Sequence, residues 1–224
     1  DETAGIYASN DGGETFTQVT NLCPDGIVKV SKNGKFVYVG SSKGLCYSDD
    51  NGKTFKKYTG KFVDEEITGM DLINDKLYVQ TFTEIWTIDT DLNIKQIESP
   101  NYPSAFPSGS GYDINVYTFS LKVSPSDPNY MMMSVREVYP DYYLIIPYYS
   151  HDGGLNWTSW MYDQKTIMNF GLTRATSREK IFIWNPKDKN IITTFGDDFL
   201  MRSTDGGVSW FCVNSVSNIM LGSR

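Results

Sequence analysis

The side chains best suited to chemistry are carboxylates in long loops of the chain. Two carboxylates that face each other roughly 5–10 Å apart can cleave a glycosidic bond, one as the acid and the other as nucleophile or base. The candidates for such a pair are Glu137, Asp141 and Asp163, with Asp113 as a fourth. Because acidic loop residues are usually only solvated, we assign no catalytic residue from the sequence.

Aromatic and basic side chains gather in the same loops, which we expect at residues 100–113, 137–143 and 161–177. Aromatic rings stack on sugars or on a protein partner, and tyrosine hydroxyls add hydrogen bonds. The predicted ligand-binding residues are Tyr102, Phe106, Tyr112, Arg136, Tyr139, Tyr142, Tyr143, Trp160, Tyr162 and Arg174. The alternative is that these side chains merely cover strand ends.

Other chemistries lack the residues that they need. The single histidine, His151, lies in a short turn where we expect it to be solvated, so no catalytic triad is predicted. Cys23, Cys46 and Cys212 contain no Cys-x-x-Cys pair. One disulfide would form if the protein is exported, but free, partly buried thiols are the commoner outcome for so few cysteines. We predict no metal and no cofactor.

Composition limits the partners and the fold class. The 224-residue chain has a net charge of −7, which would repel phosphate backbones, so no nucleic-acid partner is expected. Its apolar runs are far shorter than the ~20 residues that span a bilayer. Aromatic residues make up 14% of the chain, which favours strands over helices. The length suits one all-β domain.

Four copies of one octet organise the chain, and each reads Ser-x-Asp-x-Gly-x-x-aromatic. The glycine permits the positive φ of a tight hairpin turn, and the aspartate can accept hydrogen bonds from the amides of that turn. We therefore expect the aspartates to be structural. The four octets are defined by Ser9, Asp11, Gly13 and Phe16; Ser48, Asp50, Gly52 and Phe55; Ser150, Asp152, Gly154 and Trp157; and Ser203, Asp205, Gly207 and Trp210.

The spacing of the octets is typical of repeated units of four short strands. The first two octets begin 39 residues apart, and a degenerate copy that retains Asp89 begins another 39 residues on, at Thr87. Periods of about 40–50 residues indicate propeller blades. Two Pro-x-Asp-x-Asn turns follow in the later repeats, and we expect Asp127 and Asp188 to cap them.

The octets resemble the Asp-box, or bacterial neuraminidase repeat, of sialidase-like β-propellers, a group that includes sialidases, xyloglucan-cleaving enzymes, sortilin-like receptors and photosystem assembly factors. The resemblance implies an all-β propeller of four-stranded antiparallel blades, with about five blades or as part of a larger ring. It specifies no activity. A resemblance to sialidases in particular would include an Arg-Ile-Pro motif, and this chain lacks that motif.

We predict a single propeller domain over residues 1–224. Its expected parts are a half-blade at 1–20, blades at 25–60, 62–98, 112–160 and 163–213, and a closing strand at 216–222. The closing strand would complete the ring by pairing with the half-blade. Alternatively, the chain is a segment of a larger ring.

Topology divides the expected blades into two edges with different roles. In a four-stranded meander the first and third turns share one edge, so the octets lie opposite the long loops. We therefore predict a non-catalytic module that binds a glycan or a protein partner through the loops, on an extracellular, surface or particle-associated protein. The alternative is a glycoside hydrolase, or a fragment of one, that uses loop carboxylates.

Overall fold

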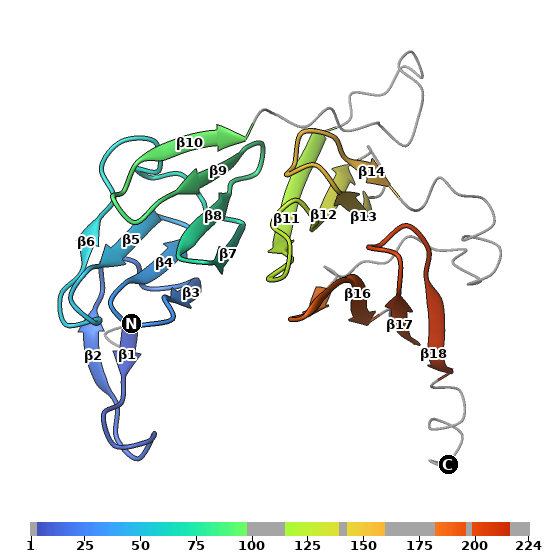
Figure 1. Cartoon of the computed structure of the whole chain (residues 1–224). Helices are drawn as coiled ribbons and strands as arrows, with labels where there is room; N and C mark the ends of the chain where they lie inside the picture. Colours follow the sequence, from blue (N-terminus) through green and yellow to red (C-terminus); the bar gives the residue numbers. More distant parts are fainter. Residues whose placement is uncertain (1–3, 98–114, 139–142, 160–181, 196–198, 216–224) are drawn as a thin grey trace, which may run out of the picture. The chain divides into compact units, whose positions relative to one another are not determined.

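The computed structural model describes residues 4–97, 115–138, 143–159, 182–195 and 199–215. Within these ranges the regular structure consists of β-strands alone, so the prediction of an all-β chain is confirmed. The chain divides into two compact units, residues 1–82 with 86–95, and residues 83–85 with 96–224. Figure 1 shows the strands of each unit.

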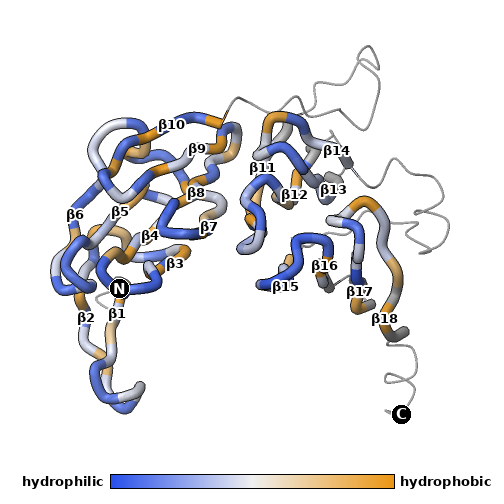
Figure 2. Tube along the Cα trace, in the orientation of Figure 1, coloured by the Kyte–Doolittle hydropathy of each residue, from blue (hydrophilic) through white to orange (hydrophobic). Residues whose placement is uncertain are grey.

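Ten strands form three sheets in the first 97 residues. They are β1 (Ile6–Ala8), β2 (Thr17–Thr20), β3 (Ile27–Val30), β4 (Val37–Ser41), β5 (Gly44–Ser48), β6 (Lys56–Lys57), β7 (Gly69–Ile73), β8 (Lys76–Gln80), β9 (Ile85–Ile88) and β10 (Ile94–Ile97). Strands β1 and β2 make a two-stranded sheet, and β3–β6 and β7–β10 are four-stranded meanders. Apolar residues are frequent on strands such as β3, whereas β6 and the turn between β1 and β2 are hydrophilic (Figure 2).

Eight further strands form two more meanders. They are β11 (Asn115–Val123), β12 (Met131–Val138), β13 (Tyr143–Ser150), β14 (Thr158–Ser159), β15 (Phe182–Asn185), β16 (Asp188–Phe195), β17 (Phe199–Ser203) and β18 (Phe211–Ser215). Strands β11–β14 and β15–β18 are each hydrogen bonded in chain order. The predicted closing strand at 216–222 lies outside the described residues, and the boundaries of the expected blades stay a prediction.

Buried apolar residues fill the space between neighbouring sheets. The cluster between β3–β6 and β7–β10 contains Tyr38, Leu45, Tyr58, Phe62, Ile67, Met70, Leu77, Val79 and Ile88. A second cluster joins β11–β14 to β15–β18 and contains Met132, Phe182, Trp184, Ile192, Met201 and Trp210. Burial of these apolar side chains against the neighbouring sheet supplies most of the hydrophobic stabilisation of the fold.

Ion pairs link the same neighbouring sheets. Lys29 on β3 lies 2.9 Å from Asp71 on β7, and both side chains are largely buried. In the other unit Lys189 on β16 donates to Asp127 at 2.7 Å. Asp127 also accepts from the amide of Asn129, as a turn cap does. The ion pair with Lys189 was not predicted from the sequence.

Two of the cysteines form a disulfide. Cys23 lies between β2 and β3, Cys46 lies on β5, and their Cα atoms are 6.2 Å apart. Both residues are fully buried beside Val39. The expectation of free thiols is therefore wrong for this pair, because chain folding brings together two cysteines that are 23 residues apart.

One recurring backbone hydrogen bond places the first and third turns of a sheet together. The amide of the fourth octet residue donates to a backbone carbonyl in, or just after, the turn between the first two strands. The pairs are Asn51 to Lys35, Gly153 to Asn129, and Gly206 to Asn190 near the start of β16, each at 3.0 Å. We call this side of the sheets the box edge. The opposite edge holds the turns between second and third strands and the connections between sheets.

Substitution of Gly26 and of Gly12 should lower the stability of the protein by different amounts. Gly26 lies in the connection from β2 to β3 and has φ +128°, and an added Cβ would clash with the Gly40 carbonyl oxygen. Gly12 has φ +76°, and no atom lies within 4 Å of the place that its own added Cβ would take. We expect Gly12→Ala to lower the free energy of unfolding by about 1 kcal/mol, from positive φ alone. Gly26→Ala should cost clearly more because the clash is with backbone. Equal losses in urea unfolding would contradict this account.

Candidate functional site

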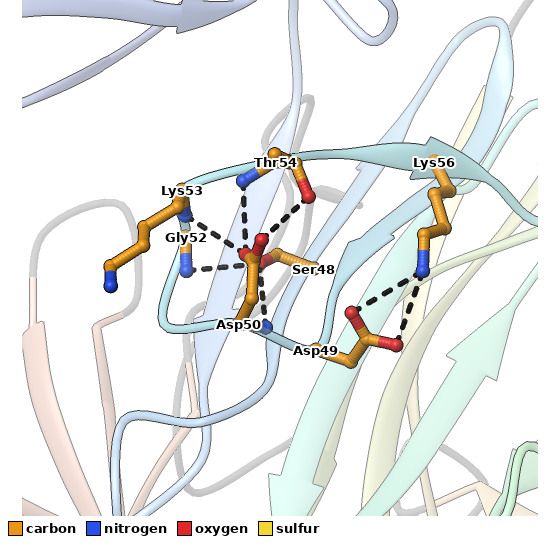
Figure 3. A network of polar contacts seen from close by, with 7 residues as sticks. All are labelled: Ser48, Asp49, Asp50, Gly52, Lys53, Thr54 and Lys56. Carbon is orange, nitrogen blue, oxygen red and sulfur yellow. Dashed lines mark hydrogen bonds and ion pairs between the residues drawn. The ribbon is translucent and has the colours of Figure 1, made fainter.

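The octet beginning at Ser48 shows how its aspartate holds the turn (Figure 3). Ser48 Oγ donates to Asp50 Oδ1 at 2.7 Å and accepts from the Gly52 amide at 2.9 Å. Asp50 Oδ1 also accepts from the Thr54 amide at 2.9 Å, and Asp50 Oδ2 accepts from the Thr54 hydroxyl at 2.6 Å. Both oxygens of the carboxylate are therefore occupied within the turn.

The seventh octet residue supplies these donors in each copy. Thr15, Asn156 and Ser209 each donate through both the backbone amide and the side chain to the aspartate four residues before them. Asn93 does the same for Asp89 in the degenerate copy, where Leu92 has a φ of 64°. This position was not predicted from the sequence, although a small polar residue stands there in all five copies.

The hydrogen bonds keep the octet carboxylates ionised. Donation from Thr15 and from Thr54 lowers the pKa of Asp11 and of Asp50 well below the ordinary range. For Asp205, burial opposes ionisation, but the hydrogen bonds from Ser209 and Ser203 outweigh it, and the pKa is again lowered. An acid that gives up its proton so readily cannot serve as a general acid near neutral pH.

The box edge is also closed by aromatic side chains in the later octets. Trp157 donates its indole N–H to the Gly154 carbonyl at 2.9 Å, and Trp210 donates to Gly207 at 3.0 Å. Both rings are buried, whereas Phe16 of the first octet is 62% exposed. In the third and fourth octets the aromatic ring is thus buried and hydrogen bonded within its own turn.

His151 differs from the expected solvated turn residue. It is exposed, but its Nε2 lies 2.8 Å from the Gly206 carbonyl oxygen, and its ring stacks on Tyr130 with 4.2 Å between centroids. Because a carbonyl can only accept, Nε2 carries a proton in this contact. His151 therefore ties the third octet to the fourth.

Three predicted site residues lie together at the end of one hairpin on the opposite edge. Glu137 pairs with Leu144, and Tyr143 pairs with Val138, where β12 and β13 approach residues 139–142. Arg136 precedes Glu137 on β12, is half-buried, and has its guanidinium carbon 4.8 Å from the centroid of the Phe119 ring. The register thus brings an arginine, an acid and a tyrosine to one sheet end.

The other predicted site residues cannot be placed. Those that lie outside the described residues are Tyr102, Phe106, Tyr112, Asp113, Tyr139, Asp141, Tyr142, Trp160, Tyr162, Asp163 and Arg174. Their roles in binding or catalysis stay a prediction.

The connection from β6 to β7 also lies on the opposite edge and was missed in the sequence. The Ile67 amide donates to the Ser41 carbonyl at 3.0 Å, which fixes the connection against the turn between β4 and β5. Lys61 Nζ lies 5.4 Å from the centroid of the Trp86 ring, and Val63 is 52% exposed. The available signal for this contact was a lysine before β7 and a tryptophan on β9.

Metal and membrane features are absent from the part of the chain that the structure describes. No three His, Cys, Asp or Glu side chains group there as ligands for a metal ion. In the same residues no helix has the length and apolar character needed to cross a membrane.

The octet network predicts a graded set of aspartate variants. Asp205→Ala removes three hydrogen bonds and should lower the free energy of unfolding by about 2 kcal/mol. Asp205→Asn keeps an acceptor oxygen and should cost less. Asp49→Ala is the control, because its exposed pair with Lys56 is worth under about 1 kcal/mol. Chemical denaturation measures all three, and an Asp49→Ala loss as large as that of Asp205→Ala would refute the proposed ranking.

The lowered pKa values also predict loss of stability in acid. The pKa of Asp152 and of Asp205 is lower in the folded protein than its ordinary value of 3.8, so their contribution is complete above that value and disappears as the pH falls through and below it. We expect similar urea midpoints at pH 7 and 5 and a decrease at pH 3. The decrease should be smaller in Asp205→Asn, and an unchanged decrease would contradict this role.

Comparison with known proteins supports the repeat and the fold. Residues 148–159, which contain the whole third octet and its flanks, match the family model of the BNR/Asp-box repeat. A comparison with curated protein sequences finds no match. The chain is similar in structure to the GH74 xyloglucanase from Xanthomonas campestris, with 16% identity and a TM-score of 0.64, over 94% of this chain and 36% of that one.

Two further solved structures extend the comparison. A GH74 enzyme from Niastella koreensis has 18% identity and a TM-score of 0.63, over 92% of this chain and 34% of the enzyme. Ycf48 from Cyanidioschyzon merolae has 11% identity and a TM-score of 0.55, over 91% and 62%. The chain thus spans about a third of the length of the GH74 enzymes. The predicted Asp-box repeat and the all-β architecture of four-stranded antiparallel sheets, as in part of a larger propeller, are confirmed.

Proposed function

We propose that the chain is a non-catalytic binding or assembly module. It recognises a glycan or a protein through the edge of its sheets that lies opposite the box edge. The observation that carries this proposal is the state of the octet carboxylates, such as Asp50 and Asp205, whose oxygens are both engaged within their own turns. Acids held in this way stabilise a scaffold and do not reach a ligand. Recognition is therefore left to the loops of the other edge.

The end of the β12–β13 hairpin supports recognition of a polar ligand. Arg136 is half-buried against Phe119, which restricts its guanidinium before a ligand arrives. A restricted donor loses less entropy on binding than a mobile one. The strand register places Glu137 and Tyr143 at the same end of the hairpin. The guanidinium of Arg136 suits acceptors such as sugar hydroxyls and peptide carbonyls.

Exposed apolar residues on β3 support a role in a larger assembly. Val28 pairs with Val39 in the same way that Met70 pairs with Val79 in the next sheet. Met70 is 1% exposed under its neighbouring sheet, whereas Val28 is 44% exposed and Val30 is 55% exposed. An uncovered apolar strand of this kind favours a further sheet or partner beside it.

A glycoside hydrolase is the alternative function. The register favours it in one respect, because Glu137 stands at the end of β12 that leads to the segment containing Asp141. A pair formed by Glu137 with Asp141 or with Asp163 would have to span the distance that glycoside hydrolysis requires.

A glycan array and a pull-down with immobilised protein test the two functions together. We expect a ligand to bind wild type and to bind the double variant Tyr139→Ala, Tyr142→Ala at least tenfold more weakly, because stacking planes are lost. Leu155→Ala is the matched control, since Leu155 is an apolar residue on the box edge with 55% exposure. It should bind like wild type.

Hydrolysis is measured on a panel of polysaccharides and reporter glycosides. The proposal predicts no turnover by wild type. Turnover that disappears in Glu137→Gln or Asp163→Asn would replace it with the hydrolase. Absence of any ligand, or equal weakening by Leu155→Ala, would remove the binding module.

A further inference from the structure

The β1–β2 hairpin has little intrinsic stability. Of the sheets that the structure describes, it is the one with two strands, and these are three and four residues long. Isolated two-stranded hairpins are marginal in water. The attachment of this hairpin to the neighbouring sheet therefore decides whether it stays ordered.

That attachment is centred on the disulfide. The apolar cluster between the hairpin and the β3–β6 sheet has three buried members, Cys23, Val39 and Cys46, with Ile6 and Phe55 packed against them. Two of the three buried residues are thus the cystine itself. The cluster on the other face of β3–β6 has nine buried residues and no cysteine.

The connection that carries Cys23 is fitted to the sheet beneath it. The Ser42 hydroxyl donates to Asp25 at 3.0 Å, and Gly26 approaches Gly40 too closely to admit a Cβ atom. These contacts hold Cys23 over β5, where its Sγ lies 3.8 Å from the Gly44 carbonyl oxygen. The bridge therefore joins a preformed connection to a central strand of the sheet.

We propose that the Cys23–Cys46 bridge is a redox clasp that docks the β1–β2 hairpin on the β3–β6 sheet. The bond closes when the two thiols pass two electrons and two protons to a disulfide of an exchange partner, which leaves as two thiols. In a reducing compartment a pair of thiols reduces the bridge during a transient opening of the hairpin. The hairpin then stays undocked and uncovers Val39 beside Val28, which is already exposed.

Burial protects the closed bridge from reduction. Both sulfur atoms belong to fully buried residues, so a reductant reaches them only after the hairpin has opened. Once closed, the bridge persists in an oxidising environment of the kind in which structural disulfides are found. This inference is independent of the proposed ligand-binding edge.

Hydrogen exchange read by mass spectrometry tests the clasp. Cys23→Ser breaks the bridge and leaves the sequence of β5 unchanged. Cys212→Ser is the matched control, because it removes the third cysteine and keeps the bridge. We expect amide protection in residues 4–22 to fall at least tenfold in Cys23→Ser and to stay at the wild-type level in Cys212→Ser. Protection in β7–β10 should be the same in all three proteins.

A second variant, Cys46→Ala, should reproduce the loss of protection. So should wild-type protein that has been reduced with a dithiol under mild denaturant and then alkylated. Unchanged protection of residues 4–22 in Cys23→Ser and Cys46→Ala would overturn the proposal. So would an equal loss in β7–β10, because the bridge would then support the whole unit and not the hairpin.

Discussion

The hydrogen bonds between an octet aspartate and its own turn are the constraint on which the sheets depend. Each carboxylate accepts from the amide and the side chain of the residue four positions later, as in Asp152 with Asn156. A turn satisfied in this way fixes the spacing of the third and fourth strands without help from the rest of the fold. The short final strands β6 and β14, of two residues each, are thereby positioned.

The same constraint separates the two edges of each sheet. The octet amide that donates to the first turn, for example Gly153 to Asn129, makes the box edge a layer of backbone and side-chain hydrogen bonds. The octet aspartates on this edge are hydrogen bonded within their own turns and remain ionised. Long loops are then free to vary at the opposite edge, which is the usual division between a scaffold and the residues that it presents.

Stability beyond the turns comes from contacts between neighbouring sheets, and these contacts differ in kind. The β3–β6 and β7–β10 sheets share a large aromatic and aliphatic cluster together with the Lys29–Asp71 pair. The β1–β2 hairpin relies on a small cluster around a cystine. A protein with this design tolerates exposed apolar residues such as Val30 only where another sheet or partner can cover them.

The sequence alone determined the features that arise from local chemistry. Ser, Asp, Gly and an aromatic at fixed spacing indicated the hairpin turns, and the apolar runs between them indicated the strands, because a turn and its flanking strands involve neighbouring residues. Tertiary structure decided the contacts between distant residues. The bridge from Cys23 to Cys46, the ion pair of Asp127 with a lysine 62 positions away, and the contact of His151 with Gly206 depend on which sheets pack together. No local pattern encodes that packing, and Arg136, Glu137 and Tyr143 share one hairpin end because the strand register places them there.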